Sequence, residues 1–551
     1  MFSKRGLAAP LLFFALALAA KGSVDASATL WLCGLAALWI TAALLPPAET
    51  PRLSALGFVV FGYAAWLVIT NTFNTYTAAA SYDAAFLVGG FLIGRRAGRE
   101  NIDLLFAVTL AFAVGLAAWS IWQRATGAAP RGRALFDTPA TLASILNLVL
   151  LPGLVVVAAG KRNVWLFAAL ALLAGAVIGT ASRGGWLALL AGGSAAFFLL
   201  RRAAITVNLR AALTIVAIFG LGYLLSLLAP LTWDITFGTA PTSAGSRFEL
   251  YQAAIDAVSH SSPLFGSGYL AFRYVLEAAR PTIPGYQEAI TYFVHNDYLQ
   301  LLLELGIPGL LLLVLLANLP IVQVWRLVPR LALPGRMAVI ALAAATTSMA
   351  VHALVDFPFY ITVCLLVYGV CIGLLEVLLA DAEHARVKGA IGPARRPARA
   401  AAWALAMWIL AKPAAAEAVS EYAKHQWRIG QGESAAYWFE MARRIDVRDW
   451  RYHWYAGQFW YSQAQVLPND AAARLADRAF AEGFAANPRE VANLLWRIST
   501  HIHLRPLLAA PVDRATLRRW ADLAYFLAPL DPRVKTQREL VAQFEAKELA
   551  R

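Results

Sequence analysis

Long apolar runs recur along the first 411 residues of the chain, and each is long enough, or nearly so, to cross about 30 Å of hydrocarbon. They lie at 6–20, 28–46, 54–70, 79–94, 103–122, 138–159, 164–180, 184–200, 210–230, 299–319, 335–354, 358–380 and 399–411. Apolar runs of this length predict membrane helices. The sequence therefore predicts an all-α, polytopic membrane protein, with about twelve or thirteen transmembrane helices in residues 1–411.

Composition supports this class. Of the 551 residues, 60% are hydrophobic and only 15% are charged, whereas soluble domains have roughly a quarter charged residues. Because further spans follow the run at 6–20 at once, we interpret that run as the first membrane helix and not as a cleavable signal peptide. The three cysteines all lie in apolar segments and have neither metal-site nor disulfide spacing.

The formal net charge of +14 predicts an orientation in the membrane. In membrane proteins such an excess reflects cytoplasmic Lys and Arg, so we expect no nucleic-acid partner. With a cytoplasmic N-terminus, alternate loops place the basic residues on one side; these are Arg95, Arg96, Arg99, Lys161, Arg162, Arg201, Arg202, Arg210, Arg326, Arg330, Arg336, Arg386, Lys388, Arg395, Arg396 and Arg399. The long segment 231–298 is then a large extracytoplasmic loop.

Seven arginines oppose this distribution, because the same topology places them on the outer side. They are Arg124, Arg131, Arg133, Arg183, Arg247, Arg273 and Arg280. Guanidinium groups bind phosphate in a bidentate manner, so an outer set of arginines is suited to an anionic substrate. The alternative for each residue taken alone is a snorkelling helix end or a partner for Asp137 or Glu249.

The amino-acid composition changes after residue 411: residues 412–551 are charged, aromatic and amphipathic. The segments "RIDVRDW", "AANPREV" and "LAPLDPRV" each follow an Ala-rich amphipathic stretch. This pattern resembles tetratricopeptide-type helical hairpins in an α-solenoid-like tail. If 399–411 spans the membrane, the tail is periplasmic; a membrane-surface helix is the alternative. The tail is either a docking surface for a polysaccharide-assembly protein or glycan, or a stabilising appendage.

The stretch "TYFVHNDYLQLLLELGIPG" places a polar group, His295-Asn296-Asp297, directly before an apolar run that holds Glu304. A carboxylate inside a membrane helix is energetically costly and therefore a functional candidate. Upstream, the turn "PLFGSG" at 263–268 is glycine-rich, which predicts a close backbone approach to a ligand. The structural alternative is that His295 caps a helix and Glu304 lies near the surface.

Taken in order, "SRGG", "GSR", "PLFGSGYLAF" and "HNDYLQLLLELGIPG" resemble the O-antigen ligase/Wzy-type polymerase family of bacterial envelope glycosyltransferases. The resemblance covers roughly residues 130–380. The segment "RGRALFDTPATLASIL" also resembles a family segment in which an Asn typically follows the Pro; here that position is Ala140. "HALVDFPFY", with His352 and Asp356, resembles a further family feature.

This resemblance implies a GT-C-like, metal-independent transferase of the bacterial inner membrane, with its active site on the periplasmic side. The donor would be an undecaprenyl-pyrophosphate-linked glycan. Catalytic roles carry over to Arg183 and Arg247, which would hold the pyrophosphate, and to His295, which would contact or deprotonate the acceptor hydroxyl. We expect Arg131, Arg133, Asn296, Glu304 and Arg273 to contribute to substrate binding.

The residues agree with this chemistry. Fixed arginines stabilise the charge that develops on a pyrophosphate leaving group, and histidine is a natural base for a hydroxyl acceptor. No DxD-like acidic pair or His/Cys cluster indicates a divalent metal, so we expect neither metal nor cofactor.

Three acceptors remain open: another lipid-linked repeat unit (a polymerase, which we favour), a lipid A-core sugar (an O-antigen ligase) or a protein hydroxyl (a protein O-oligosaccharyltransferase). Two other classes are a polysaccharide transporter or flippase and a scaffold. Transporters usually place ionisable residues at the midplane and show internal repeats, whereas here the charges gather in one outer loop.

Overall fold

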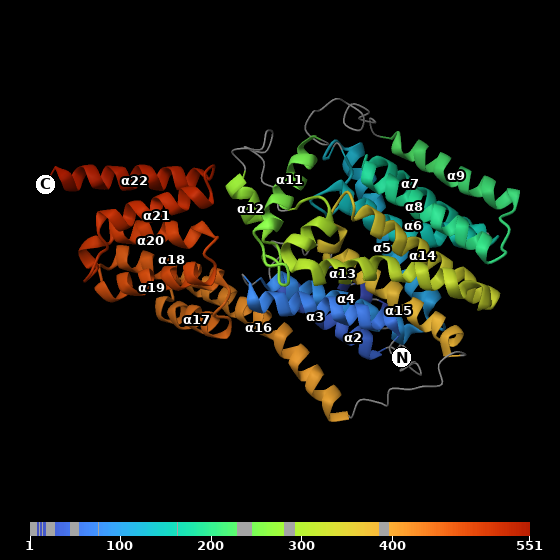
Figure 1. Ribbon diagram of the computed structural model, residues 1–551, viewed down its shortest axis with the longest axis horizontal. Coiled ribbons are helices and arrows are strands. Elements are labelled where there is room, and N and C mark those ends of the chain that lie inside the picture. The colour runs from blue at the N-terminus through green and yellow to red at the C-terminus, as the bar shows by residue number, and fades with distance from the viewer. Residues whose placement is uncertain are drawn as a thin grey trace.

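The structure is a computed structural model that describes residues 8–9, 11–13, 15–17, 28–44, 54–74, 77–129, 131–161, 163–228, 245–279, 293–384 and 396–550. Most of its described residues are helical, with no β-strand among them, which confirms the all-α prediction. Figure 1 shows a large bundle joined to a smaller stack of helices at the C-terminus. Arg280 lies outside the described residues.

The bundle contains the helices α2 (Ala28–Leu44), α3 (Ala55–Phe73), α4 (Ala78–Ala97), α5 (Ile102–Ala125), α6 (Pro139–Ala158), α7 (Val164–Gly179), α8 (Arg183–Arg202), α9 (Leu209–Ser226), α13 (Asp297–Leu327), α14 (Leu333–His352) and α15 (Thr362–His384). Two 3-10 turns, η2 (Val328–Arg330) and η3 (Pro358–Tyr360), flank α14. Between α9 and α13 lie two shorter helices, α11 (Gly245–Ser259) and α12 (Phe272–Ala279).

Eight helices of the described part are long and apolar enough to cross a membrane: α3, α5, α6, α8, α9, α13, α14 and α15. Helix α7 is apolar but has only 16 residues. These helices confirm a multi-pass membrane protein. Of the predicted spans, 6–20 is described in part, and 399–411 is part of a longer helix.

That longer helix is α16 (Arg396–Arg428), so the predicted boundary at 411/412 falls inside one continuous element. The tail continues with α17 (Gly432–Ile445), α18 (Trp450–Val466), α19 (Asp470–Ala486), α20 (Val491–His503), η4 (Arg505–Leu507), α21 (Arg514–Leu527) and α22 (Pro532–Leu549). Successive helices pack against each other as a stack (Figure 1). The stack agrees with the predicted solenoid-like form, and its tetratricopeptide resemblance stays a prediction.

The tail docks on one end of the bundle, which we call the tail-side end. Arg448 Nη2 donates to the carbonyl of Asn74, the residue that ends α3, over 3.0 Å. Arg489 Nη1 donates to the carbonyl of Ser267 over 3.2 Å, and Asn487 Nδ2 donates to Tyr274 Oη over 2.7 Å. The tail therefore contacts both the bundle and the segment between α11 and α12.

A kink in α13 and the 263–268 turn fit into each other. Gly306 leaves helical geometry (φ 70°), which frees three carbonyls of α13. Ser267 N donates to Leu303 O, Gly268 N donates to Glu304 O, and Trp66 Nε1 donates to Leu305 O, each over 2.9 Å. Every freed carbonyl thus has a donor, as a buried backbone requires.

Glycine is needed on both sides of this contact. A Cβ on Gly266 (φ +65°) would lie 2.3 Å from the carbonyl carbon of Glu304, and one on Gly306 would lie 2.6 Å from the carbonyl oxygens of the 263–264 turn. The predicted close backbone approach is therefore real, but its partner is the backbone of α13. This contact holds the start of α13, and with it residues 295–297, in place.

Candidate functional site

Three connections meet at the tail-side end of the bundle, beside the start of α13. They are the α5–α6 segment (126–138), the α7–α8 turn (180–182) and the α14–α15 segment (353–361). Arg131 joins the first two, because its Nε donates to Thr180 O over 2.8 Å and its Nη2 to Ala181 O over 3.1 Å. Asp297 N donates to Ala353 O over 2.8 Å and so joins the third to α13.

His295 lies at this junction in an unusual backbone conformation. Its φ of +61° is in the left-handed region, which residues other than glycine rarely adopt. Asn296 follows it as the N-cap of α13, where its side chain accepts from Leu299 N over 3.1 Å. Tyr251 of α11 donates its hydroxyl to His295 O over 3.0 Å. Strained backbone held by such contacts is typical of functional sites.

The His295 ring is oriented by a carboxylate. Its Nδ1 lies 3.3 Å from Asp356 Oδ1. The centroid of the His295 ring lies 5.1 Å from the centroid of the Phe357 ring, in an edge-to-face arrangement. The side chain is 22% exposed, so a substrate can reach it. Because Nδ1 faces Asp356, Nε2 is the ring nitrogen that can accept a proton from a bound hydroxyl.

Asp356 lies between two histidines. Its Oδ1 contacts His295, and its Oδ2 lies 3.8 Å from Nε2 of His352, the last residue of α14. Burial by itself raises the pKa of Asp356. The hydrogen bond from His295 and the charges of His295, His352 and Arg247 together outweigh burial, so the pKa of Asp356 lies below its ordinary value. The carboxylate is therefore ionised at neutral pH and can stabilise a protonated His295.

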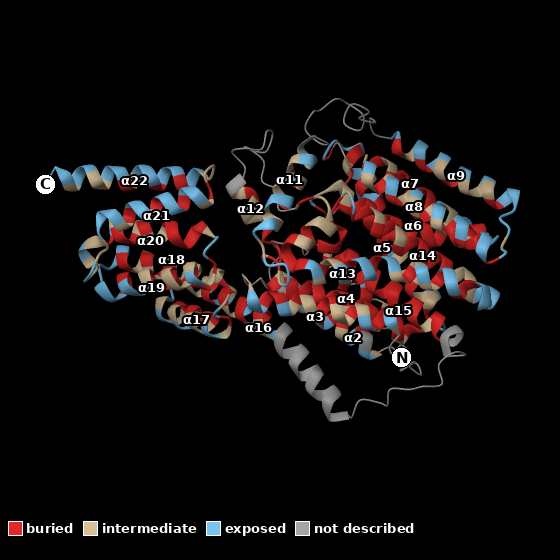
Figure 2. Cartoon of the chain, in the orientation of Figure 1, coloured by how far each residue is buried: buried red, intermediate tan, exposed pale blue. Residues whose placement is uncertain are grey.

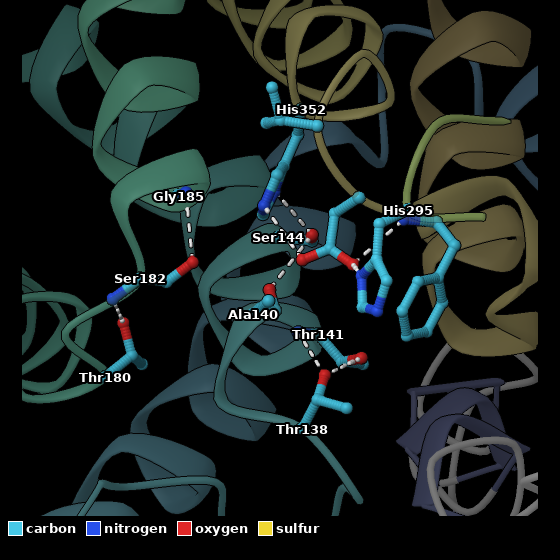
Figure 3. A network of polar contacts seen from close by, with 12 residues as sticks. Thr138, Ala140, Thr141, Ser144, Thr180, Ser182, Gly185, His295 and His352 are labelled. Carbon is cyan, nitrogen blue, oxygen red and sulfur yellow. Dashed lines mark hydrogen bonds and ion pairs between the residues drawn. The ribbon is translucent and has the colours of Figure 1, made fainter. Parts of the chain in front are cut away.

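His352 is fully buried behind this carboxylate. Its Nδ1 lies 2.7 Å from Ser144 Oγ, and Ser144 Oγ also lies 3.2 Å from the carbonyl of Ala140 (Figure 3). The α6 segment that carries Ala140 in place of the expected Asn thus supports the site through Ser144.

Three arginines surround the Asp356–His295 pair. Arg247 of α11 donates Nη1 to Val355 O over 3.0 Å, next to the carboxylate. Arg183 is the first residue of α8, after the N-cap Ser182, and a Cβ on the following Gly184 would lie 2.9 Å from Val355 and 3.1 Å from His352 Nε2. Helix α8 therefore starts against the side chains of His352 and Val355.

The charges of Asp356, Arg247 and Arg183 also act on Arg131. Burial lowers its pKa, the charge of Asp356 raises it, and the nearby Arg247 and Arg183 lower it again. An arginine remains charged after such a decrease. The guanidinium groups of Arg131, Arg183 and Arg247 are close enough to affect one another, and such a group of positive charges suits an anionic group such as pyrophosphate.

The structure gives the other predicted site residues different positions. Arg133 is exposed. Asn296 serves as a helix cap. Arg273 lies over the ring of Tyr274, 4.5 Å from its centroid, where the tail docks. These three do not join the arginine group around His295.

Glu304 is fully buried, and all its described partners are internal. Its carboxylate accepts from Leu270 N (2.8 Å), Phe272 N (3.1 Å), Gln300 Nε2 (3.1 Å) and Tyr360 Oη (2.6 Å). A carboxylate with four donors is saturated. Glu304 therefore ties residues 270–272 to α13 and η3.

Sequence reasoning gave His352 and Asp356 no individual role and missed Ser144 and Tyr251. The available signal was the i, i+4 spacing of a histidine and an aspartate at the end of an apolar run. Within the described residues, no group of three or more His, Cys, Asp and Glu side chains is placed to hold a metal ion.

A family model described as O-antigen ligase (Wzy_C) matches residues 168–314. The matched segment contains Arg183, Arg247 and His295. Over these residues the chain is similar to the O-antigen ligase family. This similarity implies a glycosyltransferase-like enzyme that acts in a membrane on a glycan donor and an acceptor. Comparison with curated proteins gives no match.

The match begins within α7 and ends within α13. Arg131, Ser144, His352 and Asp356 therefore lie outside the matched segment. Arg131, His352 and Asp356 lie against it, and Ser144 contacts His352. The site is built from the matched segment together with flanking segments on both sides in the sequence.

Proposed function

We propose that the chain transfers a glycan from an undecaprenyl-pyrophosphate-linked donor to a hydroxyl acceptor and that it polymerises surface polysaccharide repeat units. The observation that carries this proposal is the His295–Asp356 pair with Arg131, Arg183 and Arg247 around it. These residues lie at a helix end, where a bilayer-embedded lipid presents its head group.

In the proposed reaction the arginines bind the pyrophosphate. The bond between the anomeric carbon and the pyrophosphate oxygen breaks, and the electron pair leaves with the lipid pyrophosphate. Arg131 and Arg247 are held by backbone carbonyls, so their charges are already in place when this negative charge develops. In this proposal they supply the positive charge that metal ions supply in other transferases.

His295 acts as the general base. Its Nε2 accepts the proton of the acceptor hydroxyl as that oxygen forms the new bond to the anomeric carbon. Asp356, on the opposite side of the ring, stabilises the imidazolium that results. The proton thus ends on His295, and the new glycosidic bond replaces the bond to pyrophosphate.

The charge distribution supports a location for this reaction. In the predicted topology the site faces the periplasm and the chain spans the bacterial inner membrane, because the arginine-rich loops at the other end would be cytoplasmic. The tail would then also be periplasmic, where a glycan or a polysaccharide-assembly protein can reach it.

The test uses purified protein and a lipid-linked repeat unit, with and without lipid A-core. Lengthening of the lipid-linked glycan without core is the result that the proposal predicts. A product found only on lipid A-core would indicate a ligase, and a product found only on an added pilin or other hydroxyl-bearing protein would indicate protein O-glycosylation. No transfer to any acceptor, by protein that retains its fold, would overturn the proposal.

A further inference from the structure

Five exposed arginines gather at the end of the bundle opposite the tail. Arg201 and Arg202 end α8 and Arg210 lies in the first turn of α9, on the two sides of the α8–α9 connection. Arg326 lies in the last turn of α13 and Arg330 in η2, at the α13–α14 connection. We call these five residues the far-end arginine cluster. Figure 2 shows exposed residues along both connections, which lie at the end of the bundle away from the tail.

The two connections are fixed to each other by a sixth arginine. Arg336 donates Nη1 to Ala203 O (3.1 Å) in the first, and Nε to Leu331 O (2.6 Å) and Nη2 to Pro329 O (3.1 Å) in the second. All three nitrogen atoms of the Arg336 guanidinium thus donate hydrogen bonds to backbone carbonyls. Hydrogen bonds within the chain therefore hold together the backbone that carries the far-end arginine cluster.

The positive charge of the cluster is not balanced nearby. The sequence has no Asp or Glu between residues 138 and 233 or between 305 and 355, which include both connections, α8, α9, α14 and the part of α13 that leads to the cluster. None of the five arginines forms an ion pair with a described residue; the contacts of Arg201 and Arg202 are with the rings of Phe197 (5.6 Å) and Trp325 (5.7 Å). A counter-charge must come from outside the described chain.

The surface beside the cluster is apolar. Its exposed side chains are Phe197 (50%), Phe198 (58%), Val322 (39%), Trp325 (47%) and Leu333 (60%). A free phosphate or an acidic peptide would leave these side chains uncovered. An anionic head group with acyl chains attached satisfies both the charges and the apolar faces of α8 and α13.

We propose that the far-end arginine cluster binds an anionic phospholipid of the surrounding bilayer, with its phosphate on the arginines and its acyl chains along α8 and α13. Trp325 lies where tryptophan is enriched in membrane proteins, at the boundary between head groups and hydrocarbon. The binding surface is remote from His295 and goes beyond the proposed transferase function.

Native mass spectrometry of the full chain in detergent tests this directly, with cardiolipin, phosphatidylglycerol and phosphatidylcholine as probes. We expect the wild-type chain to retain the two anionic lipids and not phosphatidylcholine. The variant Arg201→Ser/Arg202→Ser/Arg326→Ser/Arg330→Ser should bind cardiolipin about tenfold more weakly, since each basic residue near a membrane surface contributes measurably to anionic-lipid binding.

The matched control is Arg428→Ser/Arg514→Ser/Arg518→Ser/Arg519→Ser, which removes four exposed arginines from the tail. It should bind cardiolipin as the wild-type chain does, which separates the local site from net charge. Cardiolipin should raise the melting temperature of the wild-type chain and of this control, and not that of the far-end variant. Equal cardiolipin binding by both quadruple variants, or equal retention of phosphatidylcholine by the wild-type chain, would overturn the proposal. Neither outcome bears on glycan transfer.

Discussion

His295 depends on residues that are distant in the sequence. Asp356, 61 positions away, orients the ring, and Tyr251 holds the backbone carbonyl. Behind Asp356, His352 and Ser144 form a second layer that no substrate touches. In metal sites, such supporting contacts often change function tenfold to a hundredfold when they are lost; we expect a comparable dependence here.

The first prediction separates the two ring nitrogens of His352. Nδ1 of His352 lies 2.7 Å from Ser144 Oγ, and its Nε2 lies 3.8 Å from Asp356 Oδ2, so the two ring nitrogens have different neighbours. His352→Gln keeps an N–H near the Nε2 position, whereas His352→Asn keeps only a partner for Ser144. We expect kcat to fall ~10- to 100-fold in His352→Asn and by less than about threefold in His352→Gln, with KM unchanged in both.

Steady-state kinetics of glycan transfer measure this difference. Ser144→Ala serves as the control for loss of the outer contact, because it leaves the histidine in place. Equal kcat values for the Gln and Asn variants would show that His352 acts only through packing.

A second prediction concerns pH and Asp356. A carboxylate whose pKa is lower in the folded than in the unfolded state stabilises the fold at every pH above its unfolded value, roughly 4, and loses this contribution as the pH falls through the folded value. Asp356→Asn should therefore unfold more easily than the wild-type chain at pH 7, by about 1–3 kcal/mol. The difference should shrink below about pH 4. Thermal unfolding in detergent from pH 3 to 7 measures it; a constant difference would contradict the account.

At the scale of elements, the contact between the 263–268 turn and the kink of α13 positions the site. It also explains why "PLFGSG" and "ELGIPG" occur together in one chain. The glycine of each motif has no Cβ, so the backbone of the other motif can pack directly against it. Phe265 strengthens the contact by stacking on Trp66 (5.8 Å) and Phe73 (4.6 Å) of α3. The contact thus fixes α13, whose first residues follow His295 directly.

The third prediction tests this contact. Gly266→Ala should destabilise the chain by about 2–5 kcal/mol, because a positive φ and a clash with immovable backbone both oppose the new Cβ. Gly127→Ala is the matched control: its φ is also positive (+73°), but a Cβ there would meet nothing within 4 Å. It should cost only about 1 kcal/mol. Similar thermal unfolding of the two variants would refute the clash.

The helices themselves were largely predictable. The apolar runs at 138–159 and 164–180 match α6 (Pro139–Ala158) and α7 (Val164–Gly179) closely, because each run ends at polar residues or glycine. Helix α13 was predicted as 299–319, and it extends to Leu327 because helical geometry continues into the charged interface beyond the apolar core. Its kink was not predicted, since Gly306 and Pro308 alone do not reveal the partner that fills the gap.

The candidate site was predictable in part. Arg183, Arg247 and His295 were identified through the family resemblance, and Arg131 through its position against the charge bias. The role of Glu304 was not predictable, because a buried carboxylate in a membrane helix has the same sequence signature whether it binds substrate or, as here, four internal donors. Only the three-dimensional structure shows which groups contact such a carboxylate.

At the scale of the whole molecule, the tail contacts the segment that packs against the kink of α13. Arg489 and Asn487 bond to residues 267 and 274, and Arg448 bonds to the end of α3. The tail therefore covers the same turn that α13 holds from the other side.

The fourth prediction is that Arg448→Ala/Asn487→Ala/Arg489→Ala loosens residues 262–277. Each lost hydrogen bond contributes about 0.5–1.5 kcal/mol, so amide exchange in this segment should increase at least about tenfold. Hydrogen–deuterium exchange measures this. Arg474→Ala/Arg478→Ala, which removes ion pairs within α19, should leave the segment unchanged. Unaltered exchange in the triple variant would mean that the tail does not restrain the site.

The central claim is that His295 and Arg247 carry out glycan transfer, and one assay tests it most directly. Purified wild-type, His295→Ala and Arg247→Ala chains, matched for amount and for melting temperature, are given the same lipid-linked repeat unit, and the glycan products are resolved by size. The account predicts a ladder of lengthened glycans for the wild-type chain and a loss of at least about a hundredfold for each variant, as expected when a general base or a charge-stabilising group is removed. Ladders of wild-type intensity from both variants would contradict it.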